Sequence, residues 1–166
     1  MREIAEACHL TKANIYYYFK DKETLYVQVL EADMRILIEA LDRASEQGTT
    51  CREKIAHITQ VFMQLMSEKN TLIQMTMRSF GGLEREIRGL ISRYRTELLR
   101  PIKVVLEQGI KQNEIIEVDT TVAAMTLIGM LGIFLTPHLL EIPLETMEHE
   151  IAPRAVQVFF DGIAKR

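Results

Sequence analysis

Features that favour a secreted, metal-bound or uniformly basic protein are absent from this sequence. The 166 residues include two cysteines, no tryptophan, four prolines and eight glycines. Cys8 and Cys51 belong to no CxxC pair and have no histidine doublet nearby, which argues against a zinc site and a disulfide framework. The formal net charge is −3, so any contact with nucleic acid has to come from a local cationic patch. We expect a cytoplasmic protein without a bound metal or cofactor.

A run long enough to span a membrane is also missing. The longest apolar run extends from Val122 to Leu135 and is interrupted only by Thr126. Its 14 residues are fewer than the roughly 20 that a helix needs to cross a bilayer. With 48% hydrophobic residues, the chain can instead bury a substantial core without a disulfide or a metal. We therefore predict that this run is a buried helix and that the protein has no membrane partner.

Helical spacing of apolar residues dominates the chain, and no stretch alternates apolar and polar residues over the length of a strand. The sequence therefore predicts an all-α fold. Gly81 and Gly82 are expected to separate two helices, Pro101 to kink a long helix, and Pro137 to end or bend another. The expected helices cover residues 2–8, 12–19, 22–47, 51–66, 70–79, 83–113, 120–136 and 145–165.

Several predicted helices begin next to polar residues of the type that caps a helix N-terminus. Thr11, Asp21 and Asp119 each precede a helix, where a side-chain oxygen can accept a hydrogen bond from a free backbone N–H group. Thr50 and Glu53 have the spacing of a capping box, in which each side chain caps the backbone of the other residue. The first cap leaves a short turn between two short helices, which is the spacing of a helix-turn-helix.

Residues 1–26, MREIAEACHLTKANIYYYFKDKETLY, contain in order an Ile-Ala helix, a tight turn, a short Tyr-rich helix, Phe-Lys and Lys-Glu-x-Leu. This order resembles the DNA-binding signature of the TetR family of bacterial repressors. The resemblance implies a helix-turn-helix with a connecting helix in residues 1–47, and a helical ligand-binding and dimerisation domain in residues 48–166. The family has a further helix before Ile4, so the first helix of the DNA-binding domain is expected to be absent here. The family commonly has glycine where His9 stands, so a left-handed, strained backbone is expected there.

The second helix of a helix-turn-helix lies in the major groove with its N-terminal residues nearest the bases. Thr11, Lys12, Ala13 and Asn14 occupy those positions. Lysine can donate to guanine, asparagine can bind adenine through two hydrogen bonds, and alanine can contact a thymine methyl group. By resemblance, the residues expected to contact phosphate or to reach the groove are Arg2, Tyr16, Tyr17 and Lys22.

An apolar contact should hold this second helix across the first. The alternative interpretation is a solvated helical hairpin, which the equal numbers of acidic and basic residues in 1–26 allow. The order and spacing of the motif favour DNA binding instead. The residues expected to pack inward are Ile4, Ala5, Cys8, Leu10, Ile15, Phe19 and Leu25.

Nine methionines are a high count for this length. Flexible thioether side chains adapt to irregular apolar ligands, although each methionine is equally well explained as ordinary core packing. We expect a few of them to line a pocket for a small apolar ligand, together with aromatic side chains. The candidate ligand-binding residues are Phe62, Met63, Met66, Met77, Phe80, Tyr94 and Met125.

Small residues on the apolar helix suggest a helix–helix interface between two copies of the chain. Glycine lets a neighbouring helix approach closely, and the last helix offers an apolar stripe that could complete a four-helix seam. DNA geometry also favours a homodimer, since two recognition helices have to lie about 34 Å apart to enter successive major grooves. The alternative is a core within one chain. The candidate interface residues are Gly129, Leu131, Gly132, Ile151, Ala155, Val158 and Phe159.

These patterns together predict a ligand-responsive DNA-binding transcriptional regulator, released from double-stranded operator DNA by a small apolar or amphipathic molecule. An enzyme is not expected, because the four histidines are isolated and the chain has no Ser-His-Asp order, phosphate-binding loop or HExxH motif. The alternative function is a helical ligand-binding or protein-interaction module without DNA activity.

Overall fold

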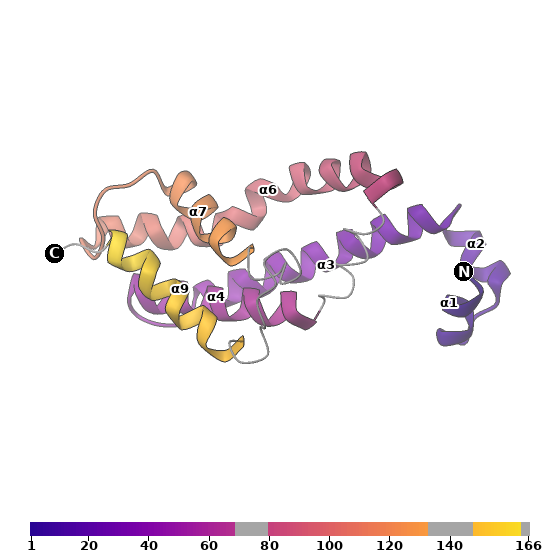
Figure 1. The fold of residues 1–166 in the computed structure, drawn as a ribbon, viewed down its shortest axis with the longest axis horizontal. Helices are drawn as coiled ribbons and strands as arrows, with labels where there is room; N and C mark the ends of the chain where they lie inside the picture. The colour runs from indigo at the N-terminus through magenta and orange to yellow at the C-terminus, as the bar shows by residue number, and fades with distance from the viewer. Residues whose placement is uncertain (69–79, 133–147, 164–166) are drawn as a thin grey trace.

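The computed structural model describes residues 1–68, 80–132 and 148–163, and within these ranges the regular structure is entirely helical (Figure 1). The all-α prediction is therefore confirmed. The helix expected over 70–79 and the effect expected of Pro137 lie outside the described residues. The helices are α1 (Arg2–Ala7), α2 (Lys12–Tyr18), α3 (Lys22–Ser45), α4 (Cys51–Glu68), α6 (Phe80–Lys111), α7 (Thr120–Gly132) and α9 (Glu148–Ile163).

The predicted N-caps are present at the starts of α2, α3 and α7. The Thr11 hydroxyl accepts a hydrogen bond of 3.1 Å from the backbone N–H of Asn14. The Asp21 carboxylate accepts one of 2.7 Å from the N–H of Thr24, and Asp119 caps α7 in the same way. Each cap satisfies a backbone donor that has no partner within the helix, so it favours a helix start at that residue.

The capping box at the start of α4 is confirmed in both directions. The Glu53 N–H donates to the Thr50 hydroxyl at 3.2 Å, and the Thr50 N–H donates to Glu53 Oε2 at 3.2 Å. Thr49 donates to the same oxygen from its backbone and its hydroxyl, both at 2.8 Å. The hydrogen bonds from Thr49 and Thr50 lower the pKa of the Glu53 carboxyl to about 2, because they stabilise its charged form.

Two helices end at residues in the left-handed backbone region that are not glycine. His9 has φ 55°, as the comparison with the family pattern predicted, and Asn113 has φ 65°. After His9 the Leu10 N–H donates to the Ala5 carbonyl at 2.8 Å. This hydrogen bond closes α1 in a Schellman motif, and asparagine and histidine tolerate the required conformation better than most side chains do.

The long helix does not begin after Gly81 and Gly82, as expected. Helix α6 begins at Phe80, so Gly81 and Gly82 lie within its first turn. Glycine disfavours a helix by only about 1 kcal/mol per residue, and the context of a long helix overrides such a preference. Pro101 occupies an interior position of α6 and is fully buried. Because proline has no N–H group, α6 lacks one backbone hydrogen bond at this point.

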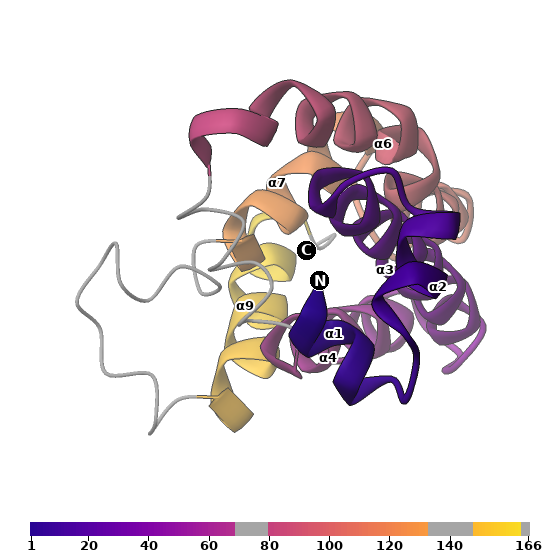
Figure 2. The ribbon, with the colours of Figure 1, turned by 90° about the vertical axis from the view of Figure 1, so that its right-hand side faces the viewer.

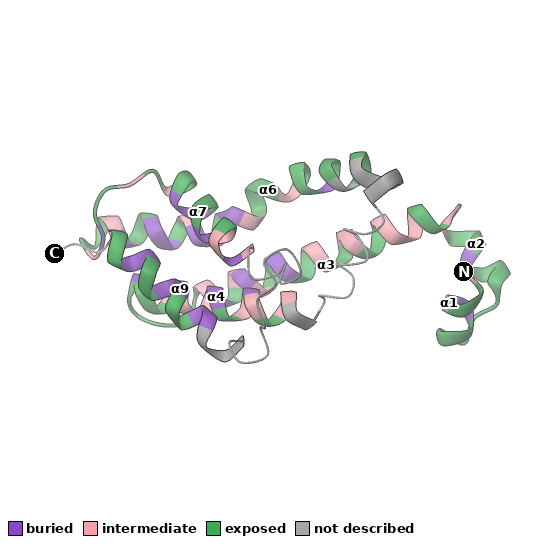
Figure 3. Ribbon diagram, in the orientation of Figure 1, coloured by how far each residue is buried: buried purple, intermediate pink, exposed green. Residues whose placement is uncertain are grey.

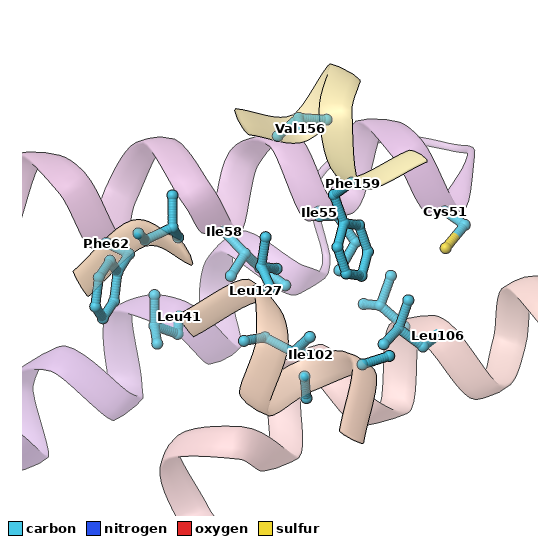
Figure 4. Close-up of a cluster of buried hydrophobic side chains, with 14 of the residues drawn as sticks. Leu41, Cys51, Ile55, Ile58, Phe62, Ile102, Leu106, Leu127, Val156 and Phe159 are labelled. Atoms are coloured by element: carbon cyan, nitrogen blue, oxygen red, sulfur yellow. The ribbon is translucent and has the colours of Figure 1, made fainter. Parts of the chain in front are cut away.

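The apolar core lies where α3, α4, α6, α7 and α9 pack together (Figure 4). Helix α3 packs against α4 and α6, α4 packs against α9, and α6 packs against α7. The side chains of Leu41, Ile55, Ile58, Leu106 and Leu127 are fully buried there. Figure 3 shows that buried residues concentrate in this body, while α1 and α2 at the other end are mostly exposed. No helix among those described is both long and apolar enough to cross a bilayer.

A close approach between α4 and α6 depends on a glycine. A Cβ atom at Gly109 would lie 2.7 Å from the Cys51 sulfur, so only glycine fits beside this buried thiol. The Cys51 N–H also donates to Glu114 Oε2 at 2.7 Å, which ties the start of α4 to the end of α6. Burial raises the pKa of the Cys51 thiol to about 11, and the nearby Glu114 adds to the effect.

Candidate functional site

Helices α1 and α2 form a small unit at one end of the molecule, which we call the N-terminal unit (residues 1–20). This end faces the viewer in Figure 2. Ala5 and Ile15 are buried where the two helices meet, and Ile4, Phe19 and Leu25 are partly buried. The expectation that Cys8 and Leu10 pack inward is wrong, because both are exposed. Two short helices and the start of α3 bury too little surface to cover them.

The four residues expected to contact bases are all exposed at the N-terminal end of α2. Thr11 caps this end, and Lys12, Ala13 and Asn14 follow in the first turn. The Lys12 ammonium lies 5.6 Å from the centre of the Tyr16 ring, within range of a weak cation–π interaction. The geometry therefore places a cationic donor, an amide and a methyl group side by side on one accessible turn.

Three consecutive tyrosines follow on the same helix with large exposed fractions. Tyr16, Tyr17 and Tyr18 are 46%, 83% and 73% exposed. The rings of Tyr17 and Tyr18 contact each other edge to face, with their centres 5.0 Å apart. Tyrosine hydroxyls are common donors to phosphate oxygens, so this exposure suits contact with a nucleic-acid backbone.

Lys22 and Arg2 flank the exposed turn of α2. Lys22 is exposed as the first residue of α3, beside the capping residue Asp21. The hydrogen bonds from Thr24 lower the pKa of the Asp21 carboxyl, so the cap is a carboxylate at neutral pH. Arg2 forms an exposed ion pair with Glu6 at 2.9 Å. Such a surface pair contributes little, so Arg2 can exchange this partner for a phosphate.

The structure brings together three of the candidate ligand-binding residues on α4. Phe62 is buried in the core, and Met63 and Met66 are partly buried against it. Met125 lies on the outer face of α7 and is 52% exposed, so a ligand enclosed by the helices would not contact it. Helix α7 is apolar all round, and its sequence therefore could not show which face points inward. Met77 and the side chain of Phe80 lie outside the described residues.

Tyr94 belongs to a polar cluster between α3 and α6 that the sequence did not reveal. Its hydroxyl donates to Glu31 Oε1 at 2.7 Å and accepts from the Arg35 Nε at 3.0 Å. Arg35 also donates to the same Glu31 oxygen at 3.2 Å. The two hydrogen bonds that the Glu31 carboxylate accepts, first that from Tyr94 and then that from Arg35, lower its pKa. We call Glu31, Arg35 and Tyr94 the α3–α6 polar cluster.

The candidate dimer residues divide into two groups. Leu131, Ile151, Ala155 and Phe159 are buried within one chain, which is the alternative that the sequence left open for them. Gly129 is exposed with nothing within 4 Å of an added Cβ, Val158 is 65% exposed, and Gly132 is intermediate.

Helix α7 adds an exposed apolar residue that sequence reasoning missed. Val122 is 59% exposed, and with Met125 and Gly129 it follows helical spacing along one face. This face is exposed in the part of the chain that the structure describes.

Comparison with known proteins identifies the family. Residues 48–134 match the family described as tetracyclin repressor-like, C-terminal domain, and residues 1–29 match the bacterial regulatory proteins of the tetR family. The chain belongs to the TetR family. In this TetR-family protein, the first of these matches covers α4, α6 and α7, and the second covers α1, α2 and the start of α3.

A curated relative and two solved structures resemble this TetR-family chain. The fatty acid metabolism regulator protein of Bacillus subtilis (strain 168) is 25% identical over 128 residues, which are 76% of this chain and 66% of that protein. The crystal structure of the regulator FadR from Bacillus subtilis in complex with stearoyl-CoA has a TM-score of 0.79 at 21% identity, over 96% of this chain and 86% of that one. The regulator PfmR from Thermus thermophilus has a TM-score of 0.73 at 18% identity, over 96% and 86%. At these identities the structures establish the shared fold.

Proposed function

We propose that this TetR-family protein is a cytoplasmic transcriptional repressor rather than an enzyme, and that it binds operator DNA as a symmetric dimer. A small amphipathic ligand held in the helical body would lower its affinity for the operator. In this proposal residues 1–47 carry DNA recognition and the connecting helix, and residues 48–166 carry ligand binding and dimerisation.

The exposed first turn of α2 is the observation that carries the proposal. Thr11 caps this turn and the hydrogen bond from Leu10 to Ala5 closes the preceding one, so the backbone leading into α2 is held at both sides. The Lys12 and Asn14 side chains are both exposed on this turn, so their donor groups face solvent. Exposed donors on a rigid helix are what recognition of base edges in the major groove requires.

The second copy would pack on the outer face of α7. Val122, Met125 and Gly129 line that face, and Val158 on the neighbouring α9 is also exposed. A glycine in this face lets a partner helix approach closely. A symmetric dimer provides the pair of recognition helices that two successive major grooves need, at a separation of about 34 Å.

The proposed ligand is an amphipathic molecule with a long apolar chain. Phe62 lies in the apolar core on α4, and the flexible side chains of Met63 and Met66 pack against that core, so they could adapt to an apolar chain. The Bacillus subtilis FadR structure contains stearoyl-CoA, which makes a long-chain acyl-CoA the first ligand to test.

DNA binding is tested with a fragment from upstream of the protein's own gene, over a series of salt concentrations. The dissociation constant should rise steeply with salt, because binding to phosphates releases counterions. Lys22→Ala should weaken binding to all sequences and reduce the salt slope by about one. Asn14→Ala should cost about 1–3 kcal/mol at one base position and relax sequence preference there. Lys111→Ala, at the far end of α6, is the matched control and should leave binding unchanged.

Ligand response is tested by adding stearoyl-CoA to the same measurement, with free coenzyme A as the control. Weaker operator binding with the acyl thioester alone would support the proposal, whereas equal affinities would contradict ligand control. If the wild-type protein shows no salt-dependent binding to DNA, the chain is instead a helical ligand-binding or interaction module.

A further inference from the structure

Two helical segments extend beyond the apolar core toward the N-terminal unit, side by side (Figure 1). In α3, the buried residues begin at Leu37, and among the described side chains of residues 22–36 none is fully buried. In α6, Leu90 is the buried residue among the described side chains of residues 85–98. Among the side chains that the structure describes, few apolar contacts therefore hold these segments, unlike the same helices within the core.

The α3–α6 polar cluster joins these two segments. Tyr94 reaches across from α6 to Glu31 and Arg35 on α3, with the hydrogen bonds of 2.7 and 3.0 Å described above. The Glu31 side chain is only 24% exposed, so solvent screens the interactions of its carboxylate less than those of a fully exposed ion pair. Hydrogen bonds to an ionised group are also stronger than neutral ones. The exposed Arg93 adds further positive charge near Glu31.

Helix α3 leads directly from this cluster to the DNA-binding unit. Glu31 lies about 14 Å along the helix axis from Lys22, at about 1.5 Å per residue. Any tilt of this segment therefore moves α2 and its exposed turn. On the α6 side, Pro101 removes a backbone hydrogen bond between the core part of α6 and the part that carries Tyr94. The α6 segment is thus less firmly coupled to the core than an uninterrupted helix would be.

We propose that Tyr94 is a positioning residue for DNA recognition: by joining Glu31 and Arg35 on α3 to α6, it sets the orientation of α3 and hence the separation of the two recognition helices. This inference rests on the proposed function as a dimeric DNA-binding protein. It assigns to Tyr94 a role between the helices in place of the ligand contact that its sequence position suggested.

A second polar link between the same two helices provides the matched control. Arg100 donates to Asp42 at 2.7 Å, also from α6 to α3. Asp42 adjoins the fully buried Leu41, and Arg100 adjoins the fully buried Pro101. The core holds both helices at this level, so losing the Arg100–Asp42 pair should leave the orientation of α3 unchanged.

The experiment compares Tyr94→Phe with Asp42→Asn in the full-length dimer without ligand. Tyr94→Phe keeps the ring and removes the hydroxyl, so we expect operator affinity to fall about five-fold or more, the lower end of typical coupling between sites. Asp42→Asn should stay within about two-fold of the wild type, near the resolution of such a comparison. Glu31→Gln and the Tyr94→Phe/Glu31→Gln double variant complete a cycle, in which the double variant should be no weaker than the more affected single one. Thermal unfolding of all variants checks that each is folded.

The separation of the recognition helices is measured directly through the exposed Cys8 on the N-terminal unit. A spin label should react there and spare Cys51, which is buried and has a raised thiol pKa of about 11. We expect the distribution of Cys8–Cys8 distances to broaden or shift in Tyr94→Phe and to remain unchanged in Asp42→Asn.

The outcomes separate this inference from the function on which it rests. A wild-type protein that binds no DNA, or that gives no distance between labels, overturns the proposed dimeric regulator and this inference with it. A wild-type protein that binds its operator while Tyr94→Phe matches Asp42→Asn in affinity and in distance overturns the role of Tyr94 alone.

Discussion

The N-terminal unit, residues 1–20, and the helical body use their side chains in opposite ways. In the unit, Ala5 and Ile15 are the buried hydrophobic residues, and three consecutive tyrosines are exposed. In the body, the core extends over five helices and buries apolar side chains from each of them. Substitutions of exposed side chains in the unit should therefore alter what the surface binds, while substitutions of buried side chains in the body should alter how stably the chain folds.

The largest difference in stability should appear when one leucine in each region is replaced by alanine. Leu106→Ala removes a fully buried side chain of the core and should lower the free energy of unfolding by about 2–5 kcal/mol. Leu10→Ala removes a side chain that is 49% exposed and should change it by no more than about 0.5 kcal/mol. Chemical denaturation of both variants measures the difference. Similar losses would show that the two regions are equally packed and would contradict the comparison.

A smaller effect should follow from adding one methyl group to the body. Gly109→Ala places a Cβ atom 2.7 Å from the Cys51 sulfur, and this overpacking should cost about 1–3 kcal/mol of unfolding free energy. Gly89→Ala, in the same helix, has nothing within 4 Å of the new atom and should stabilise the protein by up to about 1 kcal/mol. The opposite ranking in thermal unfolding would mean that α4 and α6 do not approach each other this closely.

A third substitution tests how strictly the body excludes polar groups. The Thr59 hydroxyl is fully buried and finds no hydrogen-bond partner in the part of the chain that the structure describes. Thr59→Val keeps the shape and removes this unsatisfied group, so the free energy of unfolding should rise by about 1 kcal/mol. Thr96→Val on the exposed face of α6 is the control and should be neutral within about 0.5 kcal/mol. A loss of stability in Thr59→Val would indicate that a water molecule or a ligand satisfies the hydroxyl.

Local features of the fold could be predicted from sequence, because their causes lie within a few residues. The caps at Thr11 and Asp21 and the capping box of Thr50 with Glu53 depend on neighbours three positions away. The left-handed backbone at His9 was expected from the family pattern, which commonly has glycine there. The exposed turn of α2 follows from the same local patterns. The positions of Lys12 and Asn14 on an exposed turn could therefore be predicted, whereas the roles of Arg2, Tyr16, Tyr17 and Lys22 in binding DNA were expected from the family resemblance and stay predictions.

Contacts between distant parts of the chain could not be predicted in this way. The pairing of Tyr94 with Glu31 spans 63 positions, and no local pattern marks either residue. The fit of Cys51 against Gly109 likewise depends on how two helices cross. Helix α7 shows a third limit, since an apolar residue at every turn gives no periodicity by which to assign Leu131 to the core and Met125 to the surface.

The smallest expected effect on stability concerns the N-terminal caps of one helix in each region. The cap of α2 in the unit is the neutral Thr11 hydroxyl, whereas the capping box of α4 in the body uses the Glu53 carboxylate. The folded-state pKa of Glu53, about 2, lies below the ordinary 4.5, so its contribution to stability is complete above pH 4.5 and is lost as the pH falls toward 2. The cap of α2 carries no charge and should not weaken in this window.

Glu53→Gln tests this difference, because glutamine keeps the shape of the cap but cannot carry the charge. The variant should be slightly less stable than the wild type at pH 7, with a difference that shrinks as the pH falls from 4.5 toward 2. Glu117→Gln, another exposed glutamate, should show no such convergence. Acid-unfolding curves that stay parallel for Glu53→Gln and the wild type would mean that the carboxylate adds nothing to the cap beyond its hydrogen-bonding shape.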